Sequence, residues 1–349
     1  MVSQARAWGT RGPTEKLEPM TIERRDLRPN DVAIDIAFCG ICHSDLHFAH
    51  DDWGMSKYPM VPGHEIVGIV TRVGSAVTGF APGDRVGVGC LVDSCQACDF
   101  CHSGHEQFCV ETPTFTYSAP DRQTGEITQG GYSEAIVVRK EFVCRIPDEL
   151  DLAHAAPLLC AGITTYSPLK RWGVKKGDNV AVAGLGGLGH MAVKLAKSMG
   201  AEVTVLTTSP DKAEAAVENG AGEVIISNDA EAMQAAAGRF DLVVDTIPIT
   251  HEIQPFIALL RPNGTLVVLG AIAPLPGIDG FTLIFGNRAV AGSLIGGLPE
   301  TQEMLDFCAA HGVVPEIELI GVEALNRAWA MLEKGDVPHR FVIDMQSLN

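Results

Sequence analysis

The chain has 349 residues, of which 46% are hydrophobic and 20% charged, a balance typical of a globular protein with room for two domains. Its formal net charge of −17 and the lack of a Lys/Arg-rich run disfavour nucleic acid as a partner. No basic and then apolar segment opens the sequence and no apolar run reaches about 18 residues, so we expect a cytoplasmic protein without a membrane span.

Short apolar runs separated by glycine and proline turns occupy the sequence from Asp31 to about Ile146. The runs that we interpret as strands are Val32–Phe38, Glu65–Val73, Arg85–Val88 and Ala135–Val138. This spacing is typical of a mainly β domain.

From about Leu152 onward, helical stretches alternate with strand-like runs. The predicted strands are Val180–Ala183, Val203–Leu206, Val224–Ile226, Leu242–Asp245 and Thr265–Leu269, with helices at His190–Met199 and near Lys212–Asn219. Such alternation predicts a doubly wound parallel sheet of the Rossmann type. After Gly292 we expect a helix at Pro299–Ala310 and a final strand at Arg340–Met345, in a tail that returns to the first domain.

Four cysteines lie within fifteen residues, inside a loop-like stretch: Cys95, Cys98, Cys101 and Cys109. Two-residue gaps let thiolates converge on one ion, and four sulfurs fill the tetrahedral shell of Zn²⁺. We therefore predict a structural zinc site, with an iron–sulfur cluster and chance buried cysteines as the alternatives. By contrast, we interpret four other cysteines as small buried apolar side chains: Cys39, Cys90, Cys144 and Cys308.

A second group of metal-ligand types surrounds Gly40–His47 and Pro62–Glu65, near predicted strand ends. Cys160 lies where the pattern changes between the two domains. One His and two Cys would bind zinc and leave a fourth position open, as in catalytic sites. Taken alone, a cysteine at the end of an apolar run, such as Cys160, is more often a core residue than a metal ligand.

The sequence Gly184-Leu185-Gly186-Gly187-Leu188-Gly189 follows a predicted strand and opens a predicted helix. In that context the three spaced glycines permit a tight turn, a close approach to a pyrophosphate and close helix packing. This six-residue stretch is therefore the predicted dinucleotide site.

The second strand of that domain ends without the Asp or Glu that binds the adenosine ribose of NAD. Thr207, Thr208 and Ser209 offer hydroxyl groups there, and Lys212 offers positive charge, which favours the 2′-phosphate of NADP(H). Ser209 could instead cap a helix, and the nearby Asp211 opposes phosphate binding.

Six short motifs occur along the chain in this order: Gly-Ile-Cys-His-Ser-Asp (40–45), Val-Pro-Gly-His-Glu (61–65), the four-cysteine stretch, Gly-Gly-Tyr-Ser-Glu (130–134), Leu-Leu-Cys-Ala-Gly-Ile-Thr (158–164) and Gly-Leu-Gly-Gly-Leu-Gly-His (184–190). Together they resemble the zinc-containing medium-chain dehydrogenases, in the branch of cinnamyl alcohol dehydrogenases and bacterial NADP-dependent aldehyde reductases. The resemblance implies an α/β protein with a GroES-like catalytic domain at 1–160 and 295–349 and a Rossmann-like domain at 161–294. It also implies a homodimer or homotetramer.

The resemblance further implies roles for individual residues. Catalytic zinc would be bound by Cys42, His64 and Cys160, with Glu65 able to take the fourth position. Asp45 would orient the ligand histidine, although a loop acid or a helix cap is the alternative. The remaining implied roles are a proton relay through Ser44 and His47, and cofactor contacts from His43 and Thr164. His47 could also be a merely exposed histidine.

We therefore expect two zinc ions per chain and hydride transfer between NADP(H) and a primary alcohol/aldehyde pair, aromatic or medium-chain aliphatic. Trp53 and Phe115 are candidate walls of an apolar substrate pocket, or else core residues. An NAD-linked polyol or sugar dehydrogenase is one alternative. A non-catalytic zinc-stabilised binding protein is the other.

Overall fold

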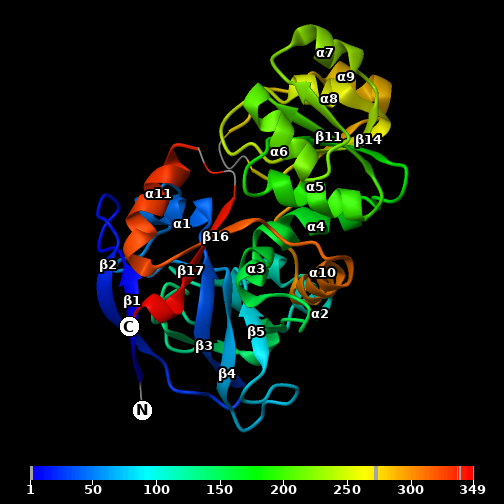
Figure 1. Cartoon of the computed structure of the whole chain (residues 1–349). Helices are drawn as coiled ribbons and strands as arrows, with labels where there is room; N and C mark the ends of the chain where they lie inside the picture. Colours follow the sequence, from blue (N-terminus) through cyan, green and yellow to red (C-terminus); the bar gives the residue numbers. More distant parts are fainter. Residues whose placement is uncertain (1–2, 271–273, 336, 338, 349) are drawn as a thin grey trace. The chain divides into compact units, whose positions relative to one another are not determined.

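A computed structural model describes residues 3–270, 274–335, 337 and 339–348 (Figure 1). The chain divides into two compact units: Met1–Cys160 with Gly296–Asn349, called unit 1, and Ala161–Ile295, called unit 2. The terminal residues 1, 2 and 349 of the predicted domain ranges lie outside the described part. No described helix is both long and apolar enough to cross a membrane.

Unit 1 is built on a mixed sheet in the order β16-β17-β3-β4-β5-β9, with β8 also paired to β3. Its strands are β3 (Asp31–Gly40), β4 (Ile66–Val73), β5 (Arg85–Val88), β8 (Ala135–Arg139), β9 (Cys144–Arg145), β16 (Ile317–Ile320) and β17 (Arg340–Asp344). Two smaller sheets pair β1 (Ser3–Gly9) with β2 (Glu18–Arg24), and β6 (Leu91–Asp93) with β7 (Thr114–Phe115). Because β17 hydrogen-bonds to β3, the tail completes the first sheet as predicted.

Apart from α10, which has 14 residues, the helices of unit 1 are short. They are α1 (His43–His50), α2 (Asp99–His102), α3 (Leu152–Ala155), α10 (Leu298–His311) and α11 (Leu325–Glu333). Single 3-10 turns occur at η1 (Glu106–Phe108), η2 (Lys140–Phe142), η3 (Ala156–Leu159), η5 (Val322–Ala324) and η6 (Met345–Leu348).

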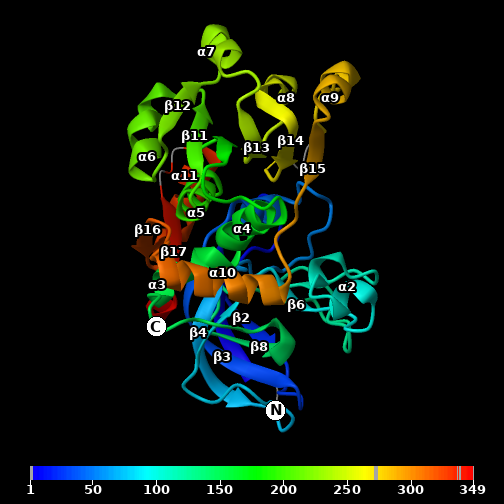
Figure 2. The ribbon, with the colours of Figure 1, turned by 90° about the vertical axis from the view of Figure 1, so that its right-hand side faces the viewer.

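Unit 2 contains a fully parallel sheet in the order β12-β11-β10-β13-β14-β15, so the predicted doubly wound Rossmann-like fold is confirmed. The strands are β10 (Asn179–Ala183), β11 (Glu202–Thr207), β12 (Glu223–Ile226), β13 (Phe240–Asp245), β14 (Leu260–Val268) and β15 (Ala289–Gly292). Figure 2 shows them with the helices α4 (Ala161–Arg171), α5 (Gly189–Ser198), α6 (Ala213–Glu218), α7 (Ala230–Ala235), α8 (Gln254–Leu259) and α9 (Gly280–Gly286), and η4 (Pro210–Lys212) precedes α6.

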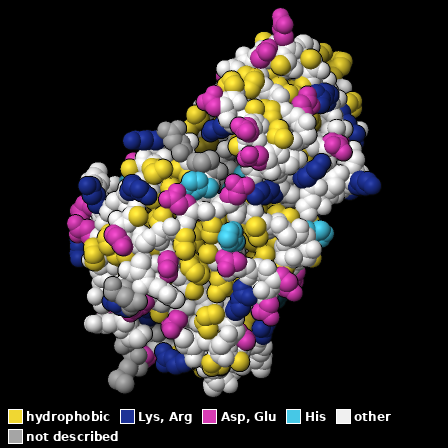
Figure 3. Space-filling view, in the orientation of Figure 1, with side chains coloured by type: hydrophobic (Ala, Val, Ile, Leu, Met, Phe, Trp, Pro, Cys, Tyr) yellow, Lys and Arg dark blue, Asp and Glu magenta, His cyan; other side chains and the backbone are white. Residues whose placement is uncertain are grey.

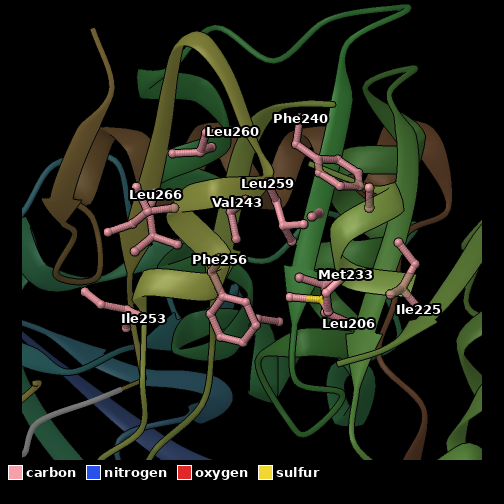
Figure 4. Close-up of a cluster of buried hydrophobic side chains, with 14 residues drawn as sticks. Leu206, Ile225, Met233, Phe240, Val243, Ile253, Phe256, Leu259, Leu260 and Leu266 are labelled. Atoms are coloured by element: carbon pink, nitrogen blue, oxygen red, sulfur yellow. The ribbon is translucent and has the colours of Figure 1, made fainter. Parts of the chain in front are cut away.

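The apolar core of unit 2 explains why this alternation folds as a layered sheet. Strand residues such as Leu206, Val243 and Leu266 meet Phe256 and Ile257 of α8 in one buried cluster (Figure 4). Burying each such side chain contributes about 1.5–3 kcal/mol. On the outside, Figure 3 shows acidic and basic side chains interspersed on the displayed face.

Candidate metal centres and nucleotide site

Four potential ligands converge at one edge of the main sheet of unit 1. Antiparallel pairing of β3 with β4 sets Cys39, near the end of β3, opposite Ile66, the first residue of β4. The segment after β3, which carries Cys42, and the segment before β4, which carries His64, therefore lie at the same end of the two strands. With Glu65 and Cys160 they form a buried group whose ligand atoms all lie within 4.8 Å of one another. This geometry brings together the four predicted ligands of the catalytic zinc.

The chemistry of this donor set fits a zinc ion. The Sγ atoms of Cys42 and Cys160 are 3.9 Å apart, and the thiol of Cys160 together with His64 holds the pKa of Cys42 well below its ordinary value. Glu65 Oε2 is buried without a hydrogen-bond partner. Two sulfurs, one imidazole and one free carboxylate oxygen are a ligand set that zinc accepts.

Asp45 holds His64, the predicted ligand histidine, in one orientation. Its Oδ1 accepts hydrogen bonds from His64 Nδ1 at 3.1 Å and from the Tyr117 hydroxyl at 2.8 Å. Its Oδ2 accepts from the backbone N–H of Cys42 at 3.0 Å and from the Tyr132 hydroxyl at 3.1 Å. Because Nδ1 is engaged, Nε2 of His64 is the nitrogen that can bind a metal.

Burial and charge act on His64 in opposite directions. Burial alone would lower its pKa, but the Asp45 carboxylate more than offsets this and holds the pKa well above its ordinary value. A bound metal would replace the proton that this arrangement otherwise attracts.

Arg340 is a member of this site that the sequence did not reveal. Its guanidinium, on β17, forms a buried ion pair with Oε1 of Glu65. A Cβ on Gly40 would lie 1.9 Å from Glu65 Oε2, so only glycine leaves space for this carboxylate. Arg340 and Glu65 are 275 positions apart in the sequence, and no local pattern links them.

The predicted relay residues lie on α1, directly after the first ligand. Ser44 Oγ is 3.7 Å from Cys42 Sγ. His47 Nδ1 donates to Asp52 Oδ2 at 2.7 Å, and its ring lies 5.2 Å from that of Trp53. His43 Nε2 donates to the carbonyl of Leu332 at 3.2 Å.

Cys90 differs from the interpretation made from the sequence. Cys39, Cys144 and Cys308 are buried as expected, but Cys90 is only half-buried. Its thiol hydrogen-bonds with Cys160, which lowers the pKa of Cys90. Cys90 therefore lies beside the group formed by Cys42, His64, Glu65 and Cys160.

The four predicted structural ligands also converge. Ligand atoms of Cys95, Cys98, Cys101 and Cys109 all lie within 4.8 Å of one another. The backbone N–H groups of Ala97 and Cys98 donate to Cys95 Sγ at 3.4 and 3.3 Å. Backbone N–H donors hold the pKa of the Cys98 thiol at about 6, which favours the thiolate that binds zinc.

The predicted dinucleotide turn joins β10 to α5. Gly184 has a φ of 89°, a conformation that favours glycine. A Cβ on Gly189 would lie 2.2 Å from the Gly184 carbonyl, whereas a Cβ on Gly186 would meet nothing within 4 Å. The first and third glycines are thus required by the turn itself. The second glycine is exposed and has space beside its backbone, whereas Leu185, Gly187 and Leu188 are half-buried.

The predicted phosphate-binding residues follow β11. Thr207 is buried and its hydroxyl accepts from the Ser209 N–H at 3.1 Å. Thr208 and Lys212 are exposed, and the Ser209 side chain makes no capping hydrogen bond to η4. Thr164 is buried on α4.

Family models match both parts of the chain: an alcohol dehydrogenase GroES-like domain at residues 28–148 and a zinc-binding dehydrogenase at residues 187–310. An NADP-dependent alcohol dehydrogenase C of Mycolicibacterium smegmatis is 52% identical, over 99% of both chains. An aldehyde reductase of Escherichia coli is 51% identical, over 98% of this chain and 99% of its own.

The fold has a counterpart among solved structures as well. A cinnamyl alcohol dehydrogenase from Sorghum bicolor superposes with a TM-score of 0.96 at 45% identity, covering 99% of this chain and 98% of its own. With the converging metal ligands and the glycine turn, these matches show that the chain belongs to the zinc-containing medium-chain alcohol dehydrogenases, in the branch of cinnamyl alcohol dehydrogenases and bacterial aldehyde reductases.

Proposed function

We propose that the chain catalyses zinc-dependent hydride transfer between NADP(H) and a primary alcohol/aldehyde pair. The observation that carries this proposal is the buried group of Cys42, His64 and Cys160. Three such ligands leave a fourth position on zinc, which either a substrate oxygen or the free oxygen of Glu65 can take. Unit 1 would be the catalytic domain and unit 2 the nucleotide domain, as predicted for 1–160, 295–349 and 161–294.

When bound, zinc would supply Lewis acidity to the carbonyl oxygen and NADPH would supply the hydride. Side chains of the protein would orient the ligands and transfer the proton. Asp45 holds His64 in one tautomer, and Arg340 holds Glu65 by one oxygen. His47, with Nδ1 on Asp52, keeps Nε2 free to exchange the proton that reaches the product oxygen through Ser44.

The other site residues keep their predicted roles in this proposal. Cys95, Cys98, Cys101 and Cys109 would bind the second, structural zinc. Thr207, Thr208, Ser209 and Lys212 would bind the 2′-phosphate, and His43 and Thr164 would contact the cofactor. Both zinc sites need reduced thiols, which supports a cytoplasmic location.

We propose a neutral, mainly apolar substrate, either aromatic or medium-chain aliphatic. Phe115, Phe48 and Met55 line a hollow of about 400 Å³ in unit 1, together with the charged residues Glu111, Asp121 and Arg122. Trp53 packs edge to face on Phe48, with ring centroids 4.9 Å apart. The aromatic side of this hollow, with Trp53 beside it, supports the proposal of an apolar substrate.

The test is NADPH oxidation with a panel of aromatic and aliphatic aldehydes, for the native chain and for Cys42→Ala. We expect turnover by the native chain only, with Cys308→Ala as a control for loss of a thiol elsewhere. Equal rates in native and Cys42→Ala protein would contradict the zinc role. Faster turnover with NADH, together with polyol oxidation, would favour the alternative of an NAD-linked polyol dehydrogenase.

We also propose that the chain forms a homodimer or homotetramer. Phe281, Ile284 and Phe285 of α9 expose 63, 78 and 76% of their surface. They lie near β15, the edge strand of the parallel sheet, whose outer side has no partner strand in the described chain. Exposed aromatic groups beside an open sheet edge are typical of an association surface.

Light scattering after gel filtration tests this proposal. Ile284→Asp should shift the protein toward the monomer, whereas Val217→Asp, which changes a 58% exposed side chain on α6, should not. A monomeric native protein would refute the proposed assembly.

A further inference from the structure

One motif of the sequence has no role in the function proposed above, Gly-Gly-Tyr-Ser-Glu at 130–134. In the structure it lies against the segment 61–63, which directly precedes His64. The two segments are joined by backbone hydrogen bonds from Gly130 to the Val61 carbonyl at 2.7 Å, from Gly131 to the Gly63 carbonyl at 2.9 Å and from Tyr132 to the Pro62 carbonyl at 3.0 Å. The motif is therefore fixed to the chain that carries the predicted ligand histidine.

Small residues make this close contact possible. A Cβ on Gly130 would lie 2.3 Å from the Pro62 carbonyl oxygen. A Cβ on Gly63 would lie 2.6 Å from the ring of Tyr132, and Gly63 also has a φ of 103°, which favours glycine. The space left by these two glycines lets the Tyr132 side chain enter the interior of unit 1, where it is fully buried.

A buried guanidinium holds the same motif. Arg24, at the end of β2, donates to the carbonyls of Gln129 and Gly130 at 2.6 and 2.7 Å and to the Ser133 hydroxyl at 2.6 Å. Hydrogen bonds from a charged donor are stronger than those between neutral groups. The position of the motif thus depends on its backbone and on Arg24, and not on the hydroxyl of Tyr132.

That hydroxyl reaches the carboxylate that orients His64. Asp45 is fully buried, so its carboxylate needs hydrogen-bond donors in place of water. Oδ1 accepts from His64 Nδ1, Gly63 N–H and the Tyr117 hydroxyl, at 3.1, 3.0 and 2.8 Å. Oδ2 accepts from the Cys42 N–H at 3.0 Å and the Tyr132 hydroxyl at 3.1 Å. Without Tyr132, Oδ2 would keep only the Cys42 N–H among these donors.

The two tyrosines act on Asp45 in the same way but to a different extent. Burial raises the pKa of Tyr117 and of Tyr132 well above the ordinary value, and the charge of Asp45 raises both further. Each hydroxyl therefore keeps the hydrogen that it donates. Tyr117 shares Oδ1 with two other donors, whereas Tyr132 shares Oδ2 with one, so the loss of Tyr132 should be felt more.

We propose that Tyr132, carried by the Gly-Gly-Tyr-Ser-Glu motif, is a positioning residue that together with Tyr117 sets the zinc affinity of the site of Cys42, His64 and Cys160, called the first zinc site. With donors on both oxygens, Asp45 cannot turn about its Cβ–Cγ bond, and His64 presents Nε2 in one direction. A ligand that is ordered before the metal arrives loses less freedom on binding. This inference rests on the proposed function, since it needs zinc at this site.

Tyr132→Phe removes the hydroxyl alone. The phenylalanine ring should keep its place, because the backbone bonds of the motif remain and the ring still packs on Trp329, with centroids 6.4 Å apart. Tyr117→Phe makes the same change at Oδ1. Tyr58→Phe is the matched control, since the Tyr58 hydroxyl donates to the Ala49 carbonyl at 2.6 Å instead of to Asp45.

The experiment measures zinc affinity of the full chain in competition with a chromogenic chelator. Cys42→Ala, which lacks the first zinc site, gives the contribution of the four-cysteine stretch. We expect the first-site affinity to fall about tenfold in Tyr132→Phe and about threefold in Tyr117→Phe, and to change less than about twofold in Tyr58→Phe. The affinity of the four-cysteine stretch should stay the same in all three variants, which a general loosening of unit 1 would not leave unchanged.

A double-mutant cycle tests whether Tyr132 acts through Asp45. In Asp45→Asn protein the orientation of His64 is already lost, so adding Tyr132→Phe should lower the first-site affinity by less than about twofold. A tenfold fall in both backgrounds would overturn the proposal. Equal first-site affinities in native and Tyr132→Phe protein would overturn it as well.

The proposed function and the role of Tyr132 can fail separately. If the native protein binds both zinc ions and Tyr132→Phe binds them equally tightly, only the role of Tyr132 is wrong. If the native protein binds zinc at the four-cysteine stretch alone, the proposed catalytic zinc is wrong and the role of Tyr132 is wrong with it.

Discussion

Both oxygens of Asp45 face backbone donors: Gly63 N–H at Oδ1 and Cys42 N–H at Oδ2. In Asp45→Asn the NH₂ group must face one of these donors, whichever way the amide turns. We expect this change to loosen His64 and to lower the affinity of the first zinc site by about 10–100-fold. Zinc analysis after dialysis against a weak chelator should find one ion per chain in place of two.

Asp35→Asn is the matched control, because Asp35 lies on β3 but is exposed. It should keep both zinc ions. If Asp45→Asn also kept both, the orienting role of Asp45 would be refuted.

At the scale of single residues, the sequence predicts the metal ligands better than the side chains that hold them and their neighbours in place. The two metal groups came from local spacing and from motifs in the expected order, and both converge in the structure. Tyr117 and Arg340 lie 72 and 275 positions from the carboxylates that they contact, Asp45 and Glu65. Only the folded sheet brings them there, so no short pattern could have revealed them.

Elements with strong apolar periodicity were predicted correctly, such as β5 at Arg85–Val88, whereas weakly patterned ones were missed. The buried positions of β1 are Ala5, Ala7 and Gly9, which are too small to stand out against a loop. The sequence predicts functional roles for residues of α1, which is rich in histidine, but it does not predict the helix itself. Its position follows from the Cys42 cap and the Asp45 hydrogen bond rather than from an apolar face.

The loop that begins at Asp121 is attached to the segment between β2 and β3 by an ion pair. Arg28 donates to both carboxylate oxygens, at 2.9 and 3.1 Å. Burial alone would raise the pKa of Asp121, but Arg28 and the N–H groups of Gln123 and Thr124 hold it at about 2. A carboxyl group with a depressed pKa stabilises the fold above its unfolded pKa of about 3.9 and loses this effect as the pH falls through about 2.

Asp121→Asn should therefore lower the free energy of unfolding by about 1–2 kcal/mol at pH 7, after allowance for partial solvent screening. Urea unfolding at pH 7, 4 and 3 measures the difference from the native protein, which should shrink below about pH 4. Asp148→Asn, at a 95% exposed side chain, should differ little from native at every pH. A constant difference for Asp121→Asn would contradict the assigned cause.

At the scale of the whole molecule, the sequence predicted a change from a β pattern to a βαβ pattern, and the chain does form two compact units. The return of the tail to the first unit was expected from family likeness as much as from pattern. The structural reason is the pairing of β17 with β3, which joins residues about 300 positions apart. Such long-range pairing leaves no local signature beyond an apolar run.

Two compact units with different proposed ligands should respond separately to ligand removal. Scanning calorimetry of the full chain should resolve a transition of unit 1 that falls after zinc chelation, because both metal groups lie in unit 1. NADPH at about 100 times its Kd should stabilise unit 2 by about 2.7 kcal/mol and raise the other transition by roughly 10 °C. Chelation should leave that second transition in place, since the glycine turn needs no metal. A single transition that moves as a whole with both treatments would instead mean that the two units unfold together, against the proposed division into a zinc domain and a nucleotide domain.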